Sequence, residues 1–173
     1  MKIDEPRPER KRRWTGPFFI AFVVFALIMA TTSVSLLSSW SEVNDASATE
    51  AEAAFEAVRA RFGDAQPYIA VEEGGGMRTT REIDSSRSFE LKGLHMLSFE
   101  PVLGKLADVA FPYWFVRLKL SDAMNLGTIV SLMARDWKHL DLRVTEDDLE
   151  ALGPALLLDH TRESGARLML WSE

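Results

Sequence analysis

The longest apolar stretch of the chain runs from Pro17 to Leu37 and contains no charged side chain. Its 21 residues, at about 1.5 Å of rise each, are enough for a helix to cross about 30 Å of hydrocarbon. In lipid, a single segment must satisfy its backbone hydrogen bonds internally and is therefore helical. The pattern predicts one transmembrane helix over residues 17–38.

The residues on either side of this stretch predict its orientation. Trp14 and Trp40 bracket it, and indole rings favour the membrane interface, so we expect both to act as interface anchors. Six Lys or Arg residues precede the stretch, whereas none follows it before Arg59. Because positive residues stay on the cytoplasmic side, residues 1–16 are predicted to form a basic cytoplasmic tail and the remainder to lie outside.

A cleaved signal peptide is the competing interpretation, since Ala46-Ser47-Ala48 has the small-x-small pattern of a cleavage site. The apolar region is longer than the ~7–15 residues of a signal peptide, however, and Ala48 lies well beyond its end. An uncleaved, single-pass anchor is therefore favoured. With the lack of Asn-x-Ser/Thr sites, these features predict a bacterial inner (cell) membrane location, with the C-terminal domain periplasmic or extracellular.

After the span the pattern becomes polar and then amphipathic. Residues 39–48 are small and polar and are expected to form a short stalk. Thr49 and Glu52 have the spacing of a capping box, so a helix is predicted from Thr49 to just before Gly63. This helix opens a domain predicted over residues 49–173. The apolar face of the helix would consist of Phe55, Val58 and Phe62.

Segments rich in alternating, β-branched and aromatic residues predict the strands of that domain. Gly93 interrupts one of them, which favours either two short strands or a single strand with a bulge. The last two segments are separated by a loop containing Gly165 and predict a closing β-hairpin. The predicted strands cover residues 67–71, 89–99, 112–120, 156–160 and 167–171.

Helical patterns alternate with these strands. Apolar residues at steps of three and four follow Ser121 as far as Trp137. Thr145 and Asp148 have capping-box geometry and predict a short helix with acidic residues in its first turn. One or two helical turns are expected within residues 101–109. The mixture of strands, hairpins and helices predicts a small α+β domain outside the membrane.

The aromatic segment at residues 111–115 is the most distinctive part of that domain. As part of a strand, it would place Trp114 on the core face, and a partly exposed patch for a protein partner or a lipid surface is the alternative. The other face of the strand would carry two aromatic and two basic residues. We predict this face as a possible partner surface, formed by Tyr113, Phe115, Arg117 and Lys119.

Charge and cysteine content narrow the classes of function. The portion after the span carries 14 Lys or Arg and 23 Asp or Glu residues, a net charge of −9, so binding to nucleic acid phosphates is not expected. The chain contains no cysteine, which excludes disulfides, thiolate metal sites and thiol nucleophiles.

Residue types that carry catalysis do not form a motif in this sequence. His95, His139 and His160 are too dispersed for a local metal site. A triad of His160 with Asp159 and Ser164 is disfavoured because neighbouring residues of a strand point to opposite faces. The Gly-Gly-Gly run lacks the Gly-Lys-Ser/Thr ending of a phosphate loop and follows two acidic residues. We therefore expect no catalytic, metal or cofactor site and no enzyme activity.

These observations lead to one functional hypothesis and one alternative. The chain is expected to be a bitopic membrane-anchored envelope protein whose acidic outer domain is a non-enzymatic interaction or accessory module of a membrane-associated complex. Its expected partners are the lipid bilayer and a protein, with other membrane proteins among the candidates. The alternative is a membrane-anchored hydrolase or ligand-binding domain whose site is assembled from residues distant in the sequence.

Overall fold

The computed structural model describes residues 40–72, 76–121, 130, 137 and 142–173. The predicted tail, the predicted span and Trp14 lie outside these ranges, as does most of the helix predicted between Ser121 and Trp137. Within the described ranges, no helix is both long and apolar enough to cross a membrane. The membrane segment therefore stays a prediction from the sequence.

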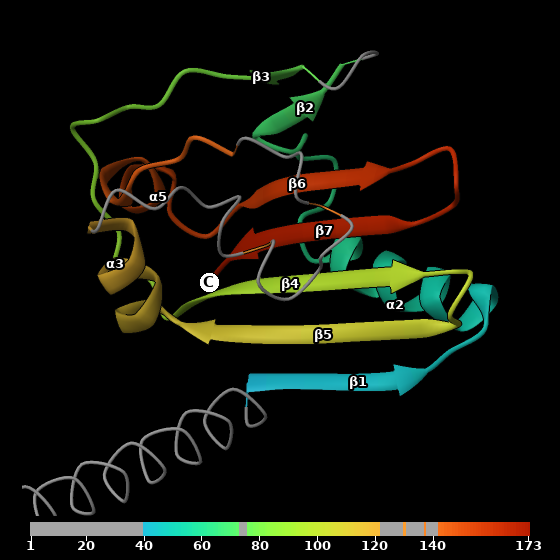
Figure 1. Ribbon diagram of the computed structural model, residues 1–173. Helices are drawn as coiled ribbons and strands as arrows, with labels where there is room; N and C mark the ends of the chain where they lie inside the picture. Colours follow the sequence, from blue (N-terminus) through green and yellow to red (C-terminus); the bar gives the residue numbers. More distant parts are fainter. Residues whose placement is uncertain (1–39, 73–75, 122–129, 131–136, 138–141) are drawn as a thin grey trace, which may run out of the picture. The chain divides into compact units, whose positions relative to one another are not determined.

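A seven-stranded sheet organises the described part of the chain, in the order β1-β5-β4-β7-β6-β2-β3 (Figure 1). Neighbouring strands are antiparallel except for β2 and β6, which are parallel. The strands are β1 (Ser41–Asp45), β2 (Ile69–Val71), β3 (Met77–Thr79), β4 (Gly93–Glu100), β5 (Lys105–Pro112), β6 (Leu156–Thr161) and β7 (Arg167–Ser172). The helices are α2 (Ala48–Ala60), α3 (Tyr113–Ser121) and α5 (Glu146–Leu152). The α+β class predicted from the sequence is confirmed.

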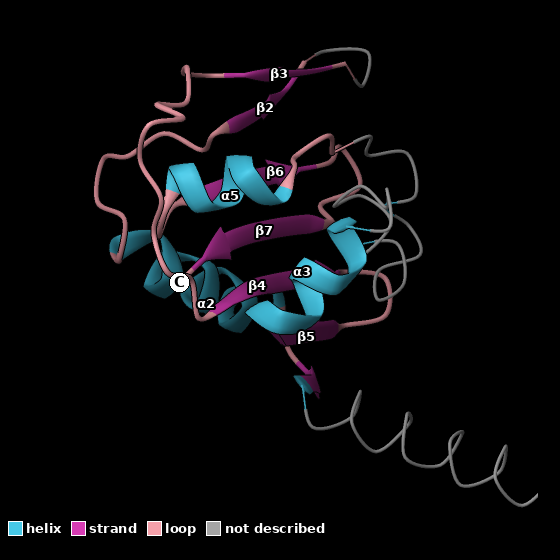
Figure 2. Cartoon of the chain, turned by 90° about the vertical axis from the view of Figure 1, so that its left-hand side faces the viewer, coloured by secondary structure: helices cyan, strands magenta, loops and turns pink. Residues whose placement is uncertain are grey.

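The two faces of the sheet carry separate apolar clusters, because successive side chains of a strand point to opposite faces. On one face, α2 inserts Phe55 among side chains of the central strands, including Leu97 and Met169. On the other face, α3 and α5 cover a larger cluster that includes Met96 and Leu170 (Figure 2). The sheet is thus covered on both sides, and its central strands contribute apolar side chains to both clusters.

A capping box starts α2, but two residues earlier than predicted. The backbone N–H of Ser47 donates to Glu50 Oε2 at 2.8 Å, and the N–H of Glu50 donates to Ser47 Oγ at 3.3 Å. The prediction of Thr49 and Glu52 as the box is wrong. Two overlapping Ser/Thr-x-x-Glu patterns occur here. The N–H of Ala46, directly after β1, donates to the Gly104 carbonyl at 2.9 Å, so Ser47 is the first residue whose N–H is free for a cap.

Residues 41–45, which the sequence predicted as part of a stalk, instead form the edge strand β1. Ser41 lies opposite Val109 of β5, and Asp45 lies opposite Lys105. Most of its side chains are exposed. A strand at the edge of a sheet needs few apolar residues and is often charged, so its composition resembles that of a linker. The compact domain consequently begins at Trp40.

The region after β4 also differs from its prediction. Helical turns were expected over residues 101–109, but β5 starts at Lys105 and pairs with both β1 and β4. The segment has a short apolar pattern with no clear period, and its pairing to two neighbours decides its conformation. The predicted helical turns are therefore wrong.

The strand predicted over residues 112–120 is wrong as well, because α3 begins at Tyr113. In these residues a helical spacing competes with the strand alternation, since Tyr113, Val116 and Leu120 recur at steps of three and four. Val116 is buried, and Tyr113 and Leu120 pack against the same core cluster. β1 already occupies the position next to β5 in the sheet, so residues 113–121 have no strand edge to pair with there. They pack on the face of the sheet as a helix instead.

Several local signals led to the observed structure. Thr145 and Asp148 form the predicted capping box of α5. β6 and β7 form the predicted hairpin, with Gly165 at a φ of 82° in its loop. The strand predicted over residues 89–99 is wrong in its form, because β4 begins only at Gly93 and pairs with β5 and β7 without a bulge. Gly93 is needed there because a Cβ would lie 2.7 Å from the Phe111 carbonyl oxygen.

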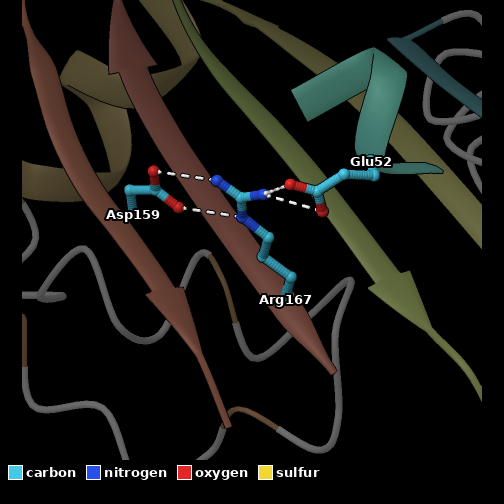
Figure 3. A network of polar contacts seen from close by, with 3 residues as sticks. All are labelled: Glu52, Asp159 and Arg167. Atoms are coloured by element: carbon cyan, nitrogen blue, oxygen red, sulfur yellow. Dashed lines mark hydrogen bonds and ion pairs between the residues drawn. The ribbon is translucent and has the colours of Figure 1, made fainter. Parts of the chain in front are cut away.

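An ion-pair network fastens α2 to this hairpin (Figure 3). Arg167 donates to Asp159 from Nε at 3.0 Å and from Nη2 at 3.1 Å, and its Nη1 donates to Glu52 at 3.0 Å. Burial by itself would lower the pKa of Arg167, but the hydrogen bonds and charges of Asp159 and Glu52 raise it. The guanidinium also lies 4.6 Å from the ring centre of Phe55. One residue of β7 thus joins α2, β6 and the core.

Candidate functional site

An open groove of about 650 Å³ lies between the start of α3, the segment Ser88–Lys92 and α5. Its lining combines aromatic, acidic and basic side chains from three separate parts of the sequence. Those used below are Ser88, Tyr113, Trp114, Arg117 and Glu150.

Backbone hydrogen bonds hold the three parts together. The N–H of Tyr113 donates to the Lys92 carbonyl at 3.0 Å, and the N–H of Phe89 donates to the Glu150 carbonyl at 2.9 Å. The segment that precedes β4 is therefore tied both to α3 and to α5. This places the Glu150 side chain in front of the first turn of α3.

Glu150 is the acceptor at the centre of the groove. Tyr113 Oη donates to Glu150 Oε1 at 3.2 Å, and Ser88 Oγ donates to Glu150 Oε2 at 3.4 Å. Burial raises the pKa of Tyr113, and the charge of Glu150 and the hydrogen bond to it raise it further. The tyrosine hydroxyl is therefore a neutral donor throughout the physiological range, and the site offers hydrogen bonding rather than an ionised phenol.

Arg117 closes the other side of the groove. Its Nε lies 2.6 Å from Glu146 Oε1, in the first turn of α5, while its side chain remains 65% exposed. An exposed pair of this kind contributes little to stability. A bound partner can therefore compete for Arg117 at small cost.

The helix separates the four residues predicted as one partner surface. Successive residues of a helix are rotated by about 100°, so Tyr113 and Arg117 share one side, whereas Phe115 belongs to the other. Tyr113 and Arg117 line the groove. Phe115 packs against the core cluster, and the Lys119 side chain lies outside the described part. The predicted surface thus contained two of the three groove residues of α3, although it assumed a strand instead of a helix.

A second surface, which we call the tryptophan surface, lies where the domain begins. It consists of Trp40, Trp114, Phe115 and Leu118. The ring centre of Trp40 lies 5.8 Å from that of Trp114 and 5.1 Å from that of Phe115. Trp114 is 58% exposed and Leu118 is 53% exposed. The prediction that Trp114 is a core residue is wrong, because the helix turns it toward solvent.

Replacement of Trp114 by alanine is consequently expected to leave the fold intact. The loss of two edge-to-face aromatic contacts should lower the free energy of unfolding by about 1 kcal/mol. Urea unfolding followed by circular dichroism measures this value. Loss of cooperative unfolding in Trp114→Ala would contradict the exposed position.

A scan against protein-family models finds no match to this chain, and neither do searches of curated proteins and of solved structures. The interpretation of the groove and of the tryptophan surface therefore depends on their geometry and chemistry.

The described histidines lie away from the groove. His95 stacks on Trp171 at 5.1 Å, and its Nε2 lies 3.3 Å from a carboxylate oxygen of Glu173. Burial lowers the pKa of His95; Asp108 opposes this effect and Arg61 adds to it. A neutral ring can still donate from Nε2 to Glu173. Among the described residues, no group of three or more His, Cys, Asp or Glu could hold a metal ion.

The lowered histidine pKa values predict a pH dependence of stability. Burial lowers the pKa of His160 as well as that of His95, so the unfolded chain binds protons more readily than the folded one. Stability is therefore present above the ordinary histidine pKa of about 6.5 and is lost as the pH falls below it. The urea midpoint should be lower at about pH 5.5 than at about pH 7.5, and less so in His95→Gln. Equal midpoints at both pH values would contradict this account.

Sequence reasoning missed Ser88 and Glu150 as groove residues. Both belong to polar segments whose composition is typical of solvated turns and helix surfaces. They come together only because β4 and α3 bring residues 88–92 against α5. A distance of 62 positions along the chain separates them, and no local spacing could have indicated this contact.

Proposed function

We propose that this chain is a single-pass, membrane-anchored protein of the bacterial envelope whose outer domain is a non-enzymatic interaction module for a membrane-associated protein. The observation that carries the proposal is the groove beside α3, which Tyr113, Trp114 and Arg117 all line. Tyr, Trp and Arg are the residue types that most often dominate the binding energy of protein interfaces.

The start of the domain supports a partner at the membrane. Trp40 already packs into the domain, and it lies only two residues after Ser38, the end of the predicted span. Two residues reach at most about 7 Å. The anchor would keep the groove close to the bilayer, where tethering raises its effective concentration toward other membrane proteins.

Topology is the first test. Six basic residues precede the span, so a reporter enzyme fused after Glu173 is expected to be active only outside the cytoplasm. The intact N-terminus should remain in the membrane fraction. A mature chain beginning near Thr49, or reporter activity in the cytoplasm, would overturn the anchoring part of the proposal.

Site-specific crosslinking in intact cells tests the groove. A photoreactive amino acid in place of Arg117 should give a discrete adduct with one protein. The matched control is the same substitution at the exposed Glu56 of α2, on the opposite face of the sheet. Adducts of equal size and yield from both positions, or none from position 117, would contradict a partner in the groove.

Ligand binding is the second candidate, because Ser88, Tyr113 and Glu150 converge on the groove from distant segments. A small ligand held there would raise the melting temperature of the full chain in detergent. The increase would be reduced in Glu150→Gln, which cannot offer a charged acceptor. The protein-partner proposal instead expects the adduct from position 117 to survive washing that removes small molecules.

A further inference from the structure

The tryptophan surface has a composition that differs from the rest of the domain. α3 has the sequence YWFVRLKLS, with two basic residues and no acidic residue, within a portion that carries a net charge of −9. Helices that lie in a membrane interface combine an apolar face of aromatic and aliphatic side chains with Arg or Lys on the polar face. Trp114 and Leu118 give the exposed side of α3 the aromatic and aliphatic part of this composition.

The position of Trp40 connects this surface to the membrane. Trp40 follows the predicted span, residues 17–38, by two residues, and as the predicted interface anchor it would lie at the level of the lipid headgroups. Its ring centre is 5.8 Å from that of Trp114, a separation comparable to the ~5–7.5 Å thickness of the headgroup region on one side of a bilayer. With Trp40 at the interface, Trp114 would lie within the headgroup region or at its edge. Leu118 follows Trp114 one turn later along α3.

We propose that the tryptophan surface docks on the outer lipid interface, so that α3 is a second membrane contact that fixes the orientation of the domain. This inference rests on the anchoring part of the proposed function. The occupant is the headgroup region of the bilayer, with Trp114 and Leu118 inserted at its boundary. The groove would then open beside the membrane, because Trp114 belongs to both surfaces.

The opposite end of the sheet provides an internal control. Val102, in the turn between β4 and β5, is 85% exposed. This turn lies at the end of β5 that is remote from α3 (Figure 1). Val102 is aliphatic and exposed like Leu118, but it does not adjoin Trp40. A difference between these two positions in a bilayer would therefore report orientation and not side-chain type.

Spin labels in the full chain can measure this orientation, since the native sequence has no cysteine. Single variants Leu118→Cys, Val102→Cys and Leu27→Cys are labelled with a nitroxide and reconstituted in vesicles of phosphatidylethanolamine and phosphatidylglycerol. Oxygen concentrates in hydrocarbon, whereas a neutral nickel complex stays in water. The ratio of their collision rates with each label gives its depth.

The expected order of depth is position 27, then position 118, then position 102. A label at 118 that is as accessible to nickel as the label at 102, with 27 deep, would overturn the lipid contact and leave the anchor intact. A label at 118 shielded from both reagents would also overturn it, because a protein, including a second copy of this chain, would cover the surface. An aqueous label at 27 would instead overturn the anchor itself. Circular dichroism of each labelled variant verifies its fold.

Discussion

Arg167→Ala is expected to lower the free energy of unfolding by about 3–5 kcal/mol. The side chains of Arg167 and Asp159 are only 14% and 16% exposed, and two parallel hydrogen bonds join them. Removing the guanidinium leaves the carboxylate of Asp159 in a poorly solvated position without its partner. The packing of the guanidinium over Phe55 is lost as well.

Urea unfolding of Arg167→Ala, Asp159→Ala, their double variant and Glu52→Ala tests this expectation. Glu52→Ala is the matched control, since Glu52 contacts the same guanidinium but is 61% exposed, and its loss should cost about 1 kcal/mol or less. In a double-mutant cycle, Arg167→Ala combined with Asp159→Ala should cost less than the sum of the single variants. Strict additivity, or equal costs for Arg167→Ala and Glu52→Ala, would show that the buried pair does not stabilise the hairpin.

Phe55→Ala is expected to have a comparable effect, about 3–5 kcal/mol. Phe55 is 1% exposed and is the large side chain by which α2 enters the cluster formed with Leu97, Phe99 and Met169. Truncation removes buried apolar area and leaves a cavity. The strands that line one side of this cavity cannot move in to fill it. The domain should melt at a much lower temperature, with α2 the first element to lose protection in hydrogen exchange.

The exposed Glu56 gives the control for this second experiment, because Glu56→Ala changes the same helix without touching the core. It should alter stability by about 0.5 kcal/mol or less. A similar loss in Glu56→Ala and Phe55→Ala would mean that helix propensity, and not core packing, holds α2 in place. Phe55 and Arg167 are in contact, so their effects should not add.

The groove and the tryptophan surface share the helix α3. The flank with Tyr113 and Arg117 lines the groove, and the flank with Trp114 and Leu118 continues to Trp40. In the proposals above, the first flank binds a protein partner and the second binds lipid. A partner in the groove would then be recognised at the membrane surface, and Leu118 and Arg117 variants should separate the two activities.

Local patterns in the sequence predicted those elements in which near neighbours interact. The capping box of α5 depends on residues three positions apart, and the β6–β7 hairpin depends on a short loop with a glycine at positive φ. The apolar face of α2 at Phe55 is visible at helical spacing as well. The charge contrast around residues 17–38 predicts the membrane anchor from the sequence alone, since it needs no tertiary contact.

Tertiary structure decided the features that involve competition between two acceptable local states. Residues 113–121 match both a strand and a helix, and the packing of Val116 and Leu120 on the sheet selects the helix. Residues 41–45 have the composition of a linker and become a strand because β5 offers them an unpaired edge. The groove itself arises from segments up to 62 positions apart. Sequence spacing predicts contacts between residues a few positions apart. The conformation of α3 and β1 and the groove depend instead on which distant segments the sheet places next to each other.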